Sequence, residues 1–229
     1  MASIELKLQQ LRQRIADACT AAQRPVQSVT LLAVGKTFPA DAMRQAHAAG
    51  CRAFGENYVQ EALGKIDALA DLKPGIEWHL IGPLQSNKTR EVAAAFDWVH
   101  TVDRLKIAER LSAQRPEGLA PLDVCVQVNV SGEASKSGVA PAELPALARA
   151  VAALPRLRLR GLMSIPEPAE GFDAQRVPHR RLRELFDALR AEGLALDTLS
   201  MGMSSDLEAA IAEGATIVRI GTALFGQRT

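Results

Sequence analysis

The sequence predicts one (β/α)8 barrel of the TIM type, preceded by an additional N-terminal helix. The length of 229 residues suits a single core of that size. About eight short apolar runs alternate with segments of helical period, as in a parallel barrel. Polar and glycine-rich stretches follow the apolar runs, at the end where such barrels carry their sites. An open flavodoxin-like sheet is the alternative if the runs at 52–54 and 196–199 are too short to be strands.

The first element is a helix, because Ile4, Leu8, Leu11 and Ile15 recur at helical spacing and Pro25 follows the pattern. Strands are expected where apolar and β-branched residues cluster: 29–35, 52–54, 76–81, 98–102, 122–130, 157–162, 196–199 and 216–220. Amphipathic helices are expected between them: 40–49, 58–72, 88–96, 104–113, 141–154, 174–192 and 206–212, with a short one after 222. No linker or low-complexity tract interrupts the pattern, so 1–229 is predicted to form one domain.

The charge balance argues against a polyanionic partner. Lys and Arg number 27 against 26 for Asp and Glu, with no basic block, so neither nucleic acid nor an anionic membrane is expected to bind. The three scattered cysteines have no metal or redox spacing and are expected to be reduced and structural. The N-terminus lacks an apolar signal core, and no stretch is long enough to span a membrane. We therefore expect a cytoplasmic protein that binds a small ligand.

Lys36 is the strongest candidate for chemistry. It follows the apolar run 29–34 and a glycine, which places its amine at the mouth of a buried strand. Partial desolvation lowers the pKa of an amine and frees its lone pair to form a Schiff base with a carbonyl. The alternative interpretation is a solvated lysine that merely ends a strand.

Two loops near the C-terminus predict a phosphate site. The first contains Ser204 and the second contains Gly221 and Thr222, in each case at the start of a predicted helix. Free backbone N–H groups at helix starts bind anions, and the loops after strands seven and eight of a barrel are frequent phosphate sites. Alternatively, Ser204 or Ser205 is only a helix N-cap and Gly221 only a turn.

Arg219 alternates with outward residues on the last predicted strand and is expected to point into the barrel. An inward arginine needs a partner, for which a ring nitrogen or an acid would serve, and a structural pair with a neighbouring carboxylate is the alternative. Asn57 and Gln85 are placed to orient a ligand or to cap a helix. His79 is interpreted as a satisfied core residue. The histidines show no metal-ligand spacing, so no metal site is expected: His47, His79, His100 and His179.

A lysine, a phosphate site and an inward arginine on one mouth together describe a pyridoxal phosphate site of the barrel type. Seven segments closely resemble the pyridoxal phosphate homeostasis protein family, also called YggS-like or proline synthase co-transcribed. They are LAVGKT (32–37), FGENYVQE (54–61), WHLIGPLQSNK (78–88), KSG (136–138), RGLM (160–163), LSMGMS (199–204) and VRIGT (218–222). The matches run through nearly the whole chain in order.

The resemblance implies a fold related to the N-terminal domain of alanine racemase, which is fold type III among pyridoxal phosphate proteins. It implies that Lys36 carries the cofactor as a Schiff base, that Arg219 approaches the pyridine nitrogen and that Asn57 lies beside the ring. It assigns the phosphate to three residues: Ser204, Gly221 and Thr222. Gly35 departs from the family, which commonly has serine at this position, and this puts any hydroxyl contact from residue 35 in doubt.

The sequence favours a carrier over an enzyme. A racemase needs acid–base groups on both faces of the substrate carbon, and Lys36 serves only one. Tyr58 is the only tyrosine, and no second domain is expected to supply another. We therefore expect a monomer without catalytic residues that buffers pyridoxal phosphate and delivers it to apo-enzymes. The alternatives are a racemase-like enzyme and a barrel enzyme that uses Lys36 on a phosphorylated metabolite.

Overall fold

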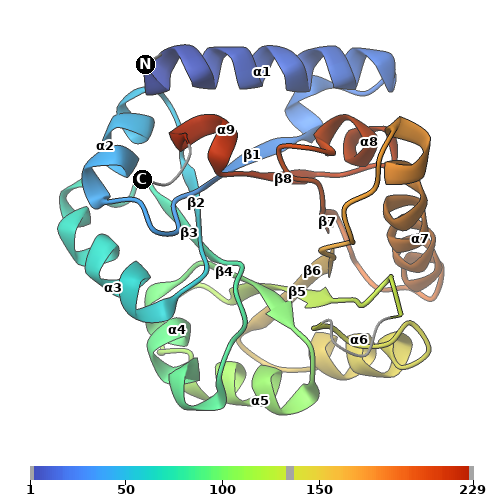
Figure 1. The fold of residues 1–229 in the computed structure, drawn as a ribbon. Coiled ribbons are helices and arrows are strands. Elements are labelled where there is room, and N and C mark those ends of the chain that lie inside the picture. Colours follow the sequence, from blue (N-terminus) through green and yellow to red (C-terminus); the bar gives the residue numbers. More distant parts are fainter. Residues whose placement is uncertain (1–2, 133–136, 227–229) are drawn as a thin grey trace.

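The computed structural model describes residues 3–132 and 137–226, and in these ranges eight parallel strands close into a barrel in chain order (Figure 1). The strands are β1 (Thr30–Val34), β2 (Ala53–Glu56), β3 (Glu77–Leu80), β4 (Trp98–Val102), β5 (Leu122–Gln127), β6 (Leu157–Met163), β7 (Thr198–Ser200) and β8 (Ile217–Ile220). The helices are α1 (Ile4–Ala21), α2 (Ala40–Ala48), α3 (Val59–Ala68), α4 (Thr89–Ala95), α5 (Leu105–Gln114), α6 (Leu144–Ala152), α7 (Phe172–Ala191), α8 (Leu207–Ala212) and α9 (Thr222–Phe225). The predicted fold class is confirmed.

The first and last strands pair to close the barrel. Leu32 of β1 lies opposite Arg219 of β8, and β1 also pairs with β2 on its other side. The additional helix α1 lies outside this seam and contacts α2, α8 and α9 (Figure 1). Ser3 caps this helix by accepting a hydrogen bond from the Leu6 N–H. Closure on β1 and β8 excludes the open flavodoxin-like sheet.

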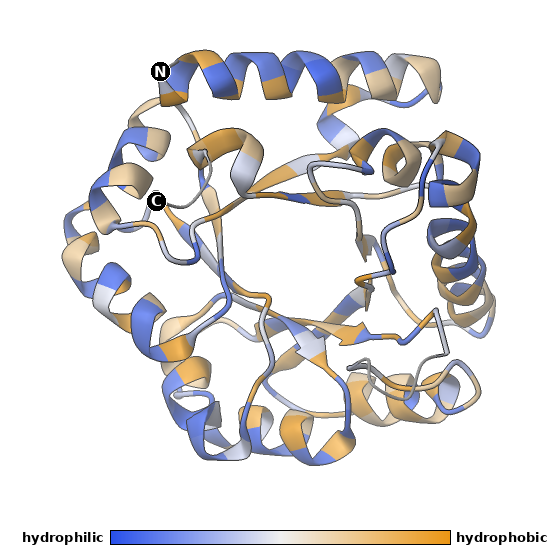
Figure 2. Cartoon of the chain, viewed as in Figure 1, coloured by the Kyte–Doolittle hydropathy of each residue, from blue (hydrophilic) through white to orange (hydrophobic). Residues whose placement is uncertain are grey.

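Apolar side chains pack in two regions, one between the strands and the helices and one inside the barrel. The larger one fills the space between the strands and the surrounding helices, and the strands are largely hydrophobic while the helices have hydrophilic outer faces (Figure 2). Inside the barrel, one small cluster comprises Leu32, Val34, Ala53, Ile81 and Ile217, and a second comprises Trp98, Cys125 and Met163. Each fully buried aliphatic side chain contributes about 1.5–3 kcal/mol. The remainder of the interior is polar.

Several predicted element limits were wrong. β5 ends at Gln127 and not at residue 130, because the chain turns aside and the Asn129 N–H donates to Val139 O. The predicted helix 58–72 divides into α3 and a 3₁₀ turn at Ala70–Leu72. β7 has only three residues, yet it pairs with both of its neighbours. Lys36 and its loop are described, whereas Lys136 of the KSG segment lies outside the described residues.

Three further expectations concern chemistry and membranes. Cys19, Cys51 and Cys125 are free and buried, as expected. In the described ranges there is no group of three or more His, Cys, Asp or Glu side chains that would hold a metal ion. Of the helices in those same ranges, none is both long enough and apolar enough to cross a bilayer.

Candidate functional site

The six predicted site residues all lie at the C-terminal mouth of the barrel or directly below it. Lys36 follows β1, Asn57 follows β2, Ser204 lies between β7 and α8, and the last pair, Gly221 and Thr222, follows β8. Because β1 pairs with β2 and β8, and β7 pairs with β8, these loops are neighbours around one mouth (Figure 1). Lys36, Asn57, Ser204 and Gly221 are half-buried and Thr222 is exposed.

Arg219 points into the barrel from β8, as predicted, and is 4% exposed. Its Nη1 donates to Ser200 O (2.6 Å) and Ser200 Oγ (2.9 Å), and its Nη2 donates to Ser164 O (2.8 Å). Burial lowers the pKa of Arg219 to about 10, so the guanidinium stays charged at neutral pH. In the described part of the chain no carboxylate lies within ion-pair distance of it. The partners of Arg219 are thus neutral oxygens, and three of its five N–H groups are used by these contacts.

Two buried oxygens near this mouth have no hydrogen-bond partner. They are Oδ1 of Asn57 and Oγ of Ser164, the residue whose carbonyl holds Arg219. The backbone of Asn57 packs directly against Gly82, because a Cβ at residue 82 would lie 2.1 Å from Asn57 O. A cavity of about 260 Å³ opens beside Asn57 and is lined by Ile81, Pro83, Thr101, Gln127, Ser137 and Ile165. Buried polar atoms without partners are rare in folded proteins, and these two oxygens are available to the polar groups of a ligand at this mouth.

A buried lysine that the sequence analysis did not identify supports the Lys36 loop. Lys65 of α3 donates through Nζ to Gly35 O (2.7 Å), Glu56 Oε1 (2.8 Å) and Glu61 Oε1 (2.5 Å). Glu61 also accepts from the Thr37 N–H at 2.6 Å, where the Thr37 φ is +68°. Burial raises the pKa of Glu56 to about 7, although the hydrogen bond and the charge of Lys65 oppose this. These contacts bind both sides of Lys36 to α3.

The glycine at residue 35 has a structural reason in this chain. A Cβ there would lie 2.7 Å from Glu56 Oε1 and 2.8 Å from Met43 Cε, closer than normal contact. Both atoms are ends of side chains, so a larger residue requires them to move. The side chains of Glu56 and Met43 therefore occupy the space that a serine side chain would need.

The loop after β7 is shaped by a carboxylate. Asp206 accepts from the Met203 N–H at 2.7 Å and contacts His179 Nε2 at 2.9 Å. Burial raises the pKa of Asp206, but the hydrogen bonds from His179 and Met203 outweigh it and hold the pKa below its usual value. The N-cap position of α8 is Asp206, so neither Ser204 nor Ser205 is the cap, contrary to the alternative raised from the sequence.

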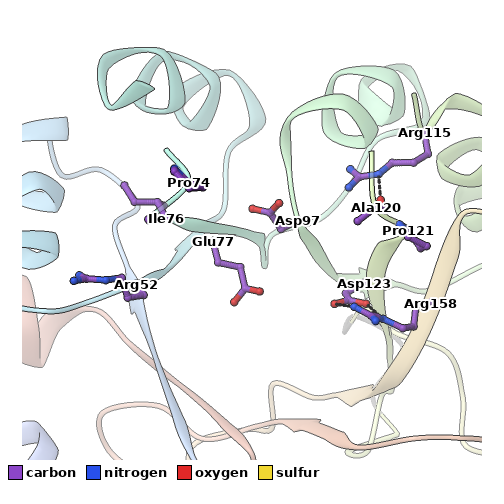
Figure 3. A pocket seen from close by; sticks show the side chains of 11 residues that line it. Arg52, Pro74, Ile76, Glu77, Asp97, Arg115, Ala120, Pro121, Asp123 and Arg158 are labelled. Carbon is purple, nitrogen blue, oxygen red and sulfur yellow. Dashed lines mark hydrogen bonds and ion pairs between the residues drawn. The ribbon is translucent and has the colours of Figure 1, made fainter. Parts of the chain in front are cut away.

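A second cavity, of about 450 Å³, lies at the opposite, N-terminal mouth (Figure 3). Glu77, at the start of β3, projects between Arg52 on one side and the Asp123–Arg158 pair on the other. Arg115 is buried in its wall and donates to the carbonyl oxygens of three residues: Ala93, Phe96 and Ala120. Like Arg219, Arg115 is buried and has neutral oxygen partners, but its cavity also contains the carboxylates of Glu77, Asp97 and Asp123.

Comparison with known proteins gives full-length similarity. The family described as "alanine racemase, N-terminal domain" matches residues 6–229. The chain is 64% identical to the pyridoxal phosphate homeostasis protein of Pseudomonas aeruginosa, with 100% of this chain and 97% of the relative covered. It is 55% identical to the protein of the same name from Escherichia coli, with 100% and 98% covered.

Solved structures show the same architecture. The structure of PipY of Synechococcus elongatus with pyridoxal phosphate bound superposes with a TM-score of 0.85 at 41% identity, covering 97% of this chain and 100% of PipY. Alanine racemase of Corynebacterium glutamicum gives a TM-score of 0.67 at 18% identity, covering 95% of this chain and 62% of the racemase. The second likeness concerns the fold alone.

Proposed function

The chain belongs to the pyridoxal phosphate homeostasis protein family, whose fold is that of the alanine racemase N-terminal domain, and from this membership we propose that it binds pyridoxal 5'-phosphate. In this proposal the protein takes part in intracellular homeostasis of the cofactor, by buffering its concentration and delivering it to apo-enzymes. The relatives that bear this name align over their whole length, and PipY, at 41% identity, binds the same cofactor.

The residues at the C-terminal mouth fit such a cofactor. The unpaired oxygens of Asn57 and Ser164 would be satisfied by a polar ligand. The observation that carries the proposal is Arg219, a buried cation on the mouth that holds Lys36, with neutral protein partners and no carboxylate beside it among the described residues. A buried charge in such surroundings is costly unless a ligand or a network compensates it.

Bound pyridoxal phosphate supplies three groups: a pyridine nitrogen, a phosphate dianion and an aldehyde. The aldehyde condenses reversibly with a primary amine. We assign Lys36 to the aldehyde, Arg219 to the ring nitrogen and Asn57 to the side of the ring. Hydroxyl and backbone N–H donors from the neighbouring loops are assigned to the phosphate: Ser204, Gly221 and Thr222. Lys65 contributes indirectly, because it binds Gly35 and so fixes the backbone from which Lys36 extends.

We further propose a carrier without catalytic residues. A charged Arg219 disfavours protonation of the pyridine nitrogen, and only the protonated ring withdraws electrons strongly. Tyr58, the only tyrosine of the chain, is 59% exposed and stands directly before α3. Among the described residues we therefore assign no second acid–base group opposite Lys36, while reversible binding needs only the amine and the phosphate loops. A monomer is sufficient for this role.

Absorption spectra and chemical trapping test the binding proposal. The purified protein is expected to gain visible absorption with pyridoxal phosphate, and borohydride reduction is expected to fix the cofactor on Lys36, as located by peptide mass spectrometry. Lys36→Ala removes the amine and is expected to abolish both signals, whereas Lys106→Ala, at an exposed lysine of α5, is the matched control. A parent protein that stays colourless with excess cofactor contradicts the proposal.

The carrier role is tested separately. Transfer of cofactor from the loaded protein to an apo-enzyme is expected in a single turnover, and its rate is compared with release into buffer. Exchange of the α-hydrogen of alanine or serine in deuterated water is expected to stay at the level of the Lys36→Ala variant. Sustained exchange that depends on Lys36 would replace the carrier with a racemase-like enzyme.

A further inference from the structure

A continuous chain of hydrogen bonds crosses the barrel interior below Arg219. Arg219 Nη1 donates to Ser200 Oγ (2.9 Å), which lies 2.8 Å from Nδ1 of His100. Nε2 of His100 lies 2.9 Å from Nδ1 of His79, and Nε2 of His79 lies 3.2 Å from Glu77 Oε2. The serine and both histidines are buried, while the Glu77 side chain is 50% exposed in the cavity at the N-terminal mouth (Figure 3). The chain therefore connects the two mouths.

The two ends of this hydrogen-bond chain, Arg219 and Glu77, decide which way every hydrogen bond points. A guanidinium has only donors and a carboxylate has only acceptors. Ser200 Oγ accepts from Arg219, so its single proton is free to be donated to His100 Nδ1. His100 then carries its proton on Nε2 and donates to His79, which carries its proton on Nε2 and donates to Glu77. Both imidazoles are neutral in the same tautomer, and each nitrogen along the path has a partner.

The opposite direction satisfies fewer groups. If His79 carried two protons, it would donate to His100 Nε2, and His100 would donate to Ser200 Oγ. The hydroxyl proton of Ser200 would then have no acceptor in its described contacts, and a buried donor without an acceptor is costly. Burial lowers the pKa of His100 well below its ordinary value, and the charge of Arg219 acts in the same direction. A neutral His100 belongs to both arrangements, so the unsatisfied hydroxyl proton of Ser200 is what favours the first.

Trp98 holds the Glu77 end of the hydrogen-bond chain in place. Its indole N–H donates to Glu77 Oε1 at 3.1 Å, so each oxygen of this carboxylate has its own donor. The Trp98 ring stacks on His79 with centroids 5.3 Å apart, and the Arg160 guanidinium lies 4.8 Å above the Trp98 ring. The Trp98 ring covers the buried His79, and exclusion of water there lowers the local dielectric and strengthens the hydrogen bonds of His79.

We infer that Ser200, His100, His79 and Glu77 are positioning residues for the cofactor site: they hold Arg219 in one orientation and link it by hydrogen bonds to a carboxylate at the opposite mouth of the barrel. The inference rests on the proposed function, because Arg219 is the group assigned to the pyridine nitrogen. Glu77 is four hydrogen bonds from Arg219, and its carboxylate is the end of this hydrogen-bond chain. Changing the charge of Glu77 therefore alters the cofactor mouth without altering any residue there.

The direction of the chain is tested without cofactor. Long-range proton–nitrogen correlation spectra of protein labelled with 15N-histidine report which ring nitrogens are protonated, with assignments from His79→Gln and His100→Gln. At pH 7 both histidines are expected as neutral Nε2–H tautomers, and Ser200→Ala is expected to shift the Nδ1 signal of His100. A doubly protonated His79, or an Nδ1–H tautomer of His100, would overturn the inference.

Cofactor retention tests the positioning role. Equilibrium dialysis with pyridoxal phosphate compares Ser200→Ala and Glu77→Gln with Glu109→Gln, a control at an exposed glutamate of α5. Because hydrogen bonds to charged groups are the stronger ones, Ser200→Ala is expected to raise the dissociation constant about tenfold and Glu77→Gln about threefold. Unchanged retention in both variants, with Lys36 still trapped by borohydride, overturns the inference and leaves the proposed function intact. A parent protein that retains no cofactor overturns both, while the spectra still decide the direction of the chain.

Discussion

Replacing Lys65 by methionine removes the cation from the buried cluster below Lys36 while keeping most of the side-chain volume. Gly35 O and Glu56 Oε1 each lose a donor, and Glu61 keeps the Thr37 N–H. Burial raises the pKa of Glu56 to about 7 in the folded parent protein, against an ordinary value of 4.5. Because Lys65 opposes this shift, the pKa of Glu56 is expected to rise further in Lys65→Met.

The size of the effect follows from proton linkage. A carboxyl group whose pKa is raised on folding contributes stability that is complete below its unfolded pKa and is lost as the pH rises through its folded pKa. In the parent protein this loss levels off above about pH 7, and in Lys65→Met it continues to higher pH at about 1.4 kcal/mol per pH unit. The hydrogen bond lost by Gly35 O costs about 1 kcal/mol at either pH, and the titration of Glu56 adds to it above pH 7. The free energy of unfolding of the variant is therefore expected to be lower than that of the parent by about 1 kcal/mol at pH 6 and by about 2–3 kcal/mol at pH 8.

Urea unfolding followed by far-ultraviolet circular dichroism, at pH 6 and at pH 8, measures this difference. Lys106→Met, at an exposed lysine, controls for the loss of a positive charge, and the double variant Lys65→Met/Glu56→Gln is expected to lose the pH dependence. A destabilisation that is equal at the two pH values, or larger at pH 6, would refute the assignment of the titration to Glu56.

Two further predictions concern the loops that carry the site. Gly35→Ser forces Glu56 and Met43 to move, so urea unfolding is expected to show a free energy of unfolding lower by about 1–2 kcal/mol. Borohydride labelling of Lys36 is expected to persist, and equal or greater stability of the variant would contradict the crowding at residue 35. Asp206→Asn removes a carboxylate whose pKa lies below its usual value in the folded protein, so the stability it contributes is present at neutral pH and is lost as the pH falls through that lowered pKa. The variant is therefore expected to be less stable than the parent by about 1–2 kcal/mol at pH 7 and to approach it near pH 3 in thermal unfolding, whereas a gap that stays constant with pH would assign the effect to packing.

Local patterns in the sequence were sufficient for most of the fold. The run before Lys36 and the alternation around Arg219 reflect burial in neighbouring strands: Lys36 follows its predicted strand and Arg219 lies on its own. The errors at β5 and α3 arise where tertiary hydrogen bonds, such as that from Asn129 to Val139, redirect the backbone. Such contacts have no local signature.

The parts of the site that the sequence analysis missed are contacts between distant residues. His100 and Ser200 are 100 positions apart and meet only because the barrel closes. Lys65 looked like an ordinary residue of an amphipathic helix, and its burial becomes clear only with Glu56 and Gly35 on the neighbouring strands. A buried histidine on each of two adjacent strands was the signal available, since polar side chains inside a barrel need polar partners.

The pairing of β1 with β8 has a consequence for biosynthesis. Lys36 follows the first strand to be made and Arg219 belongs to the last, so a nascent chain exposes the amine long before the barrel can close around it. Domains begin to fold while they are still being translated, but a site that spans this seam cannot form until the final strand has left the ribosome. Ligand binding at the seam would then act as a late check on completed synthesis, and it would stabilise only chains in which the first and last strands have met.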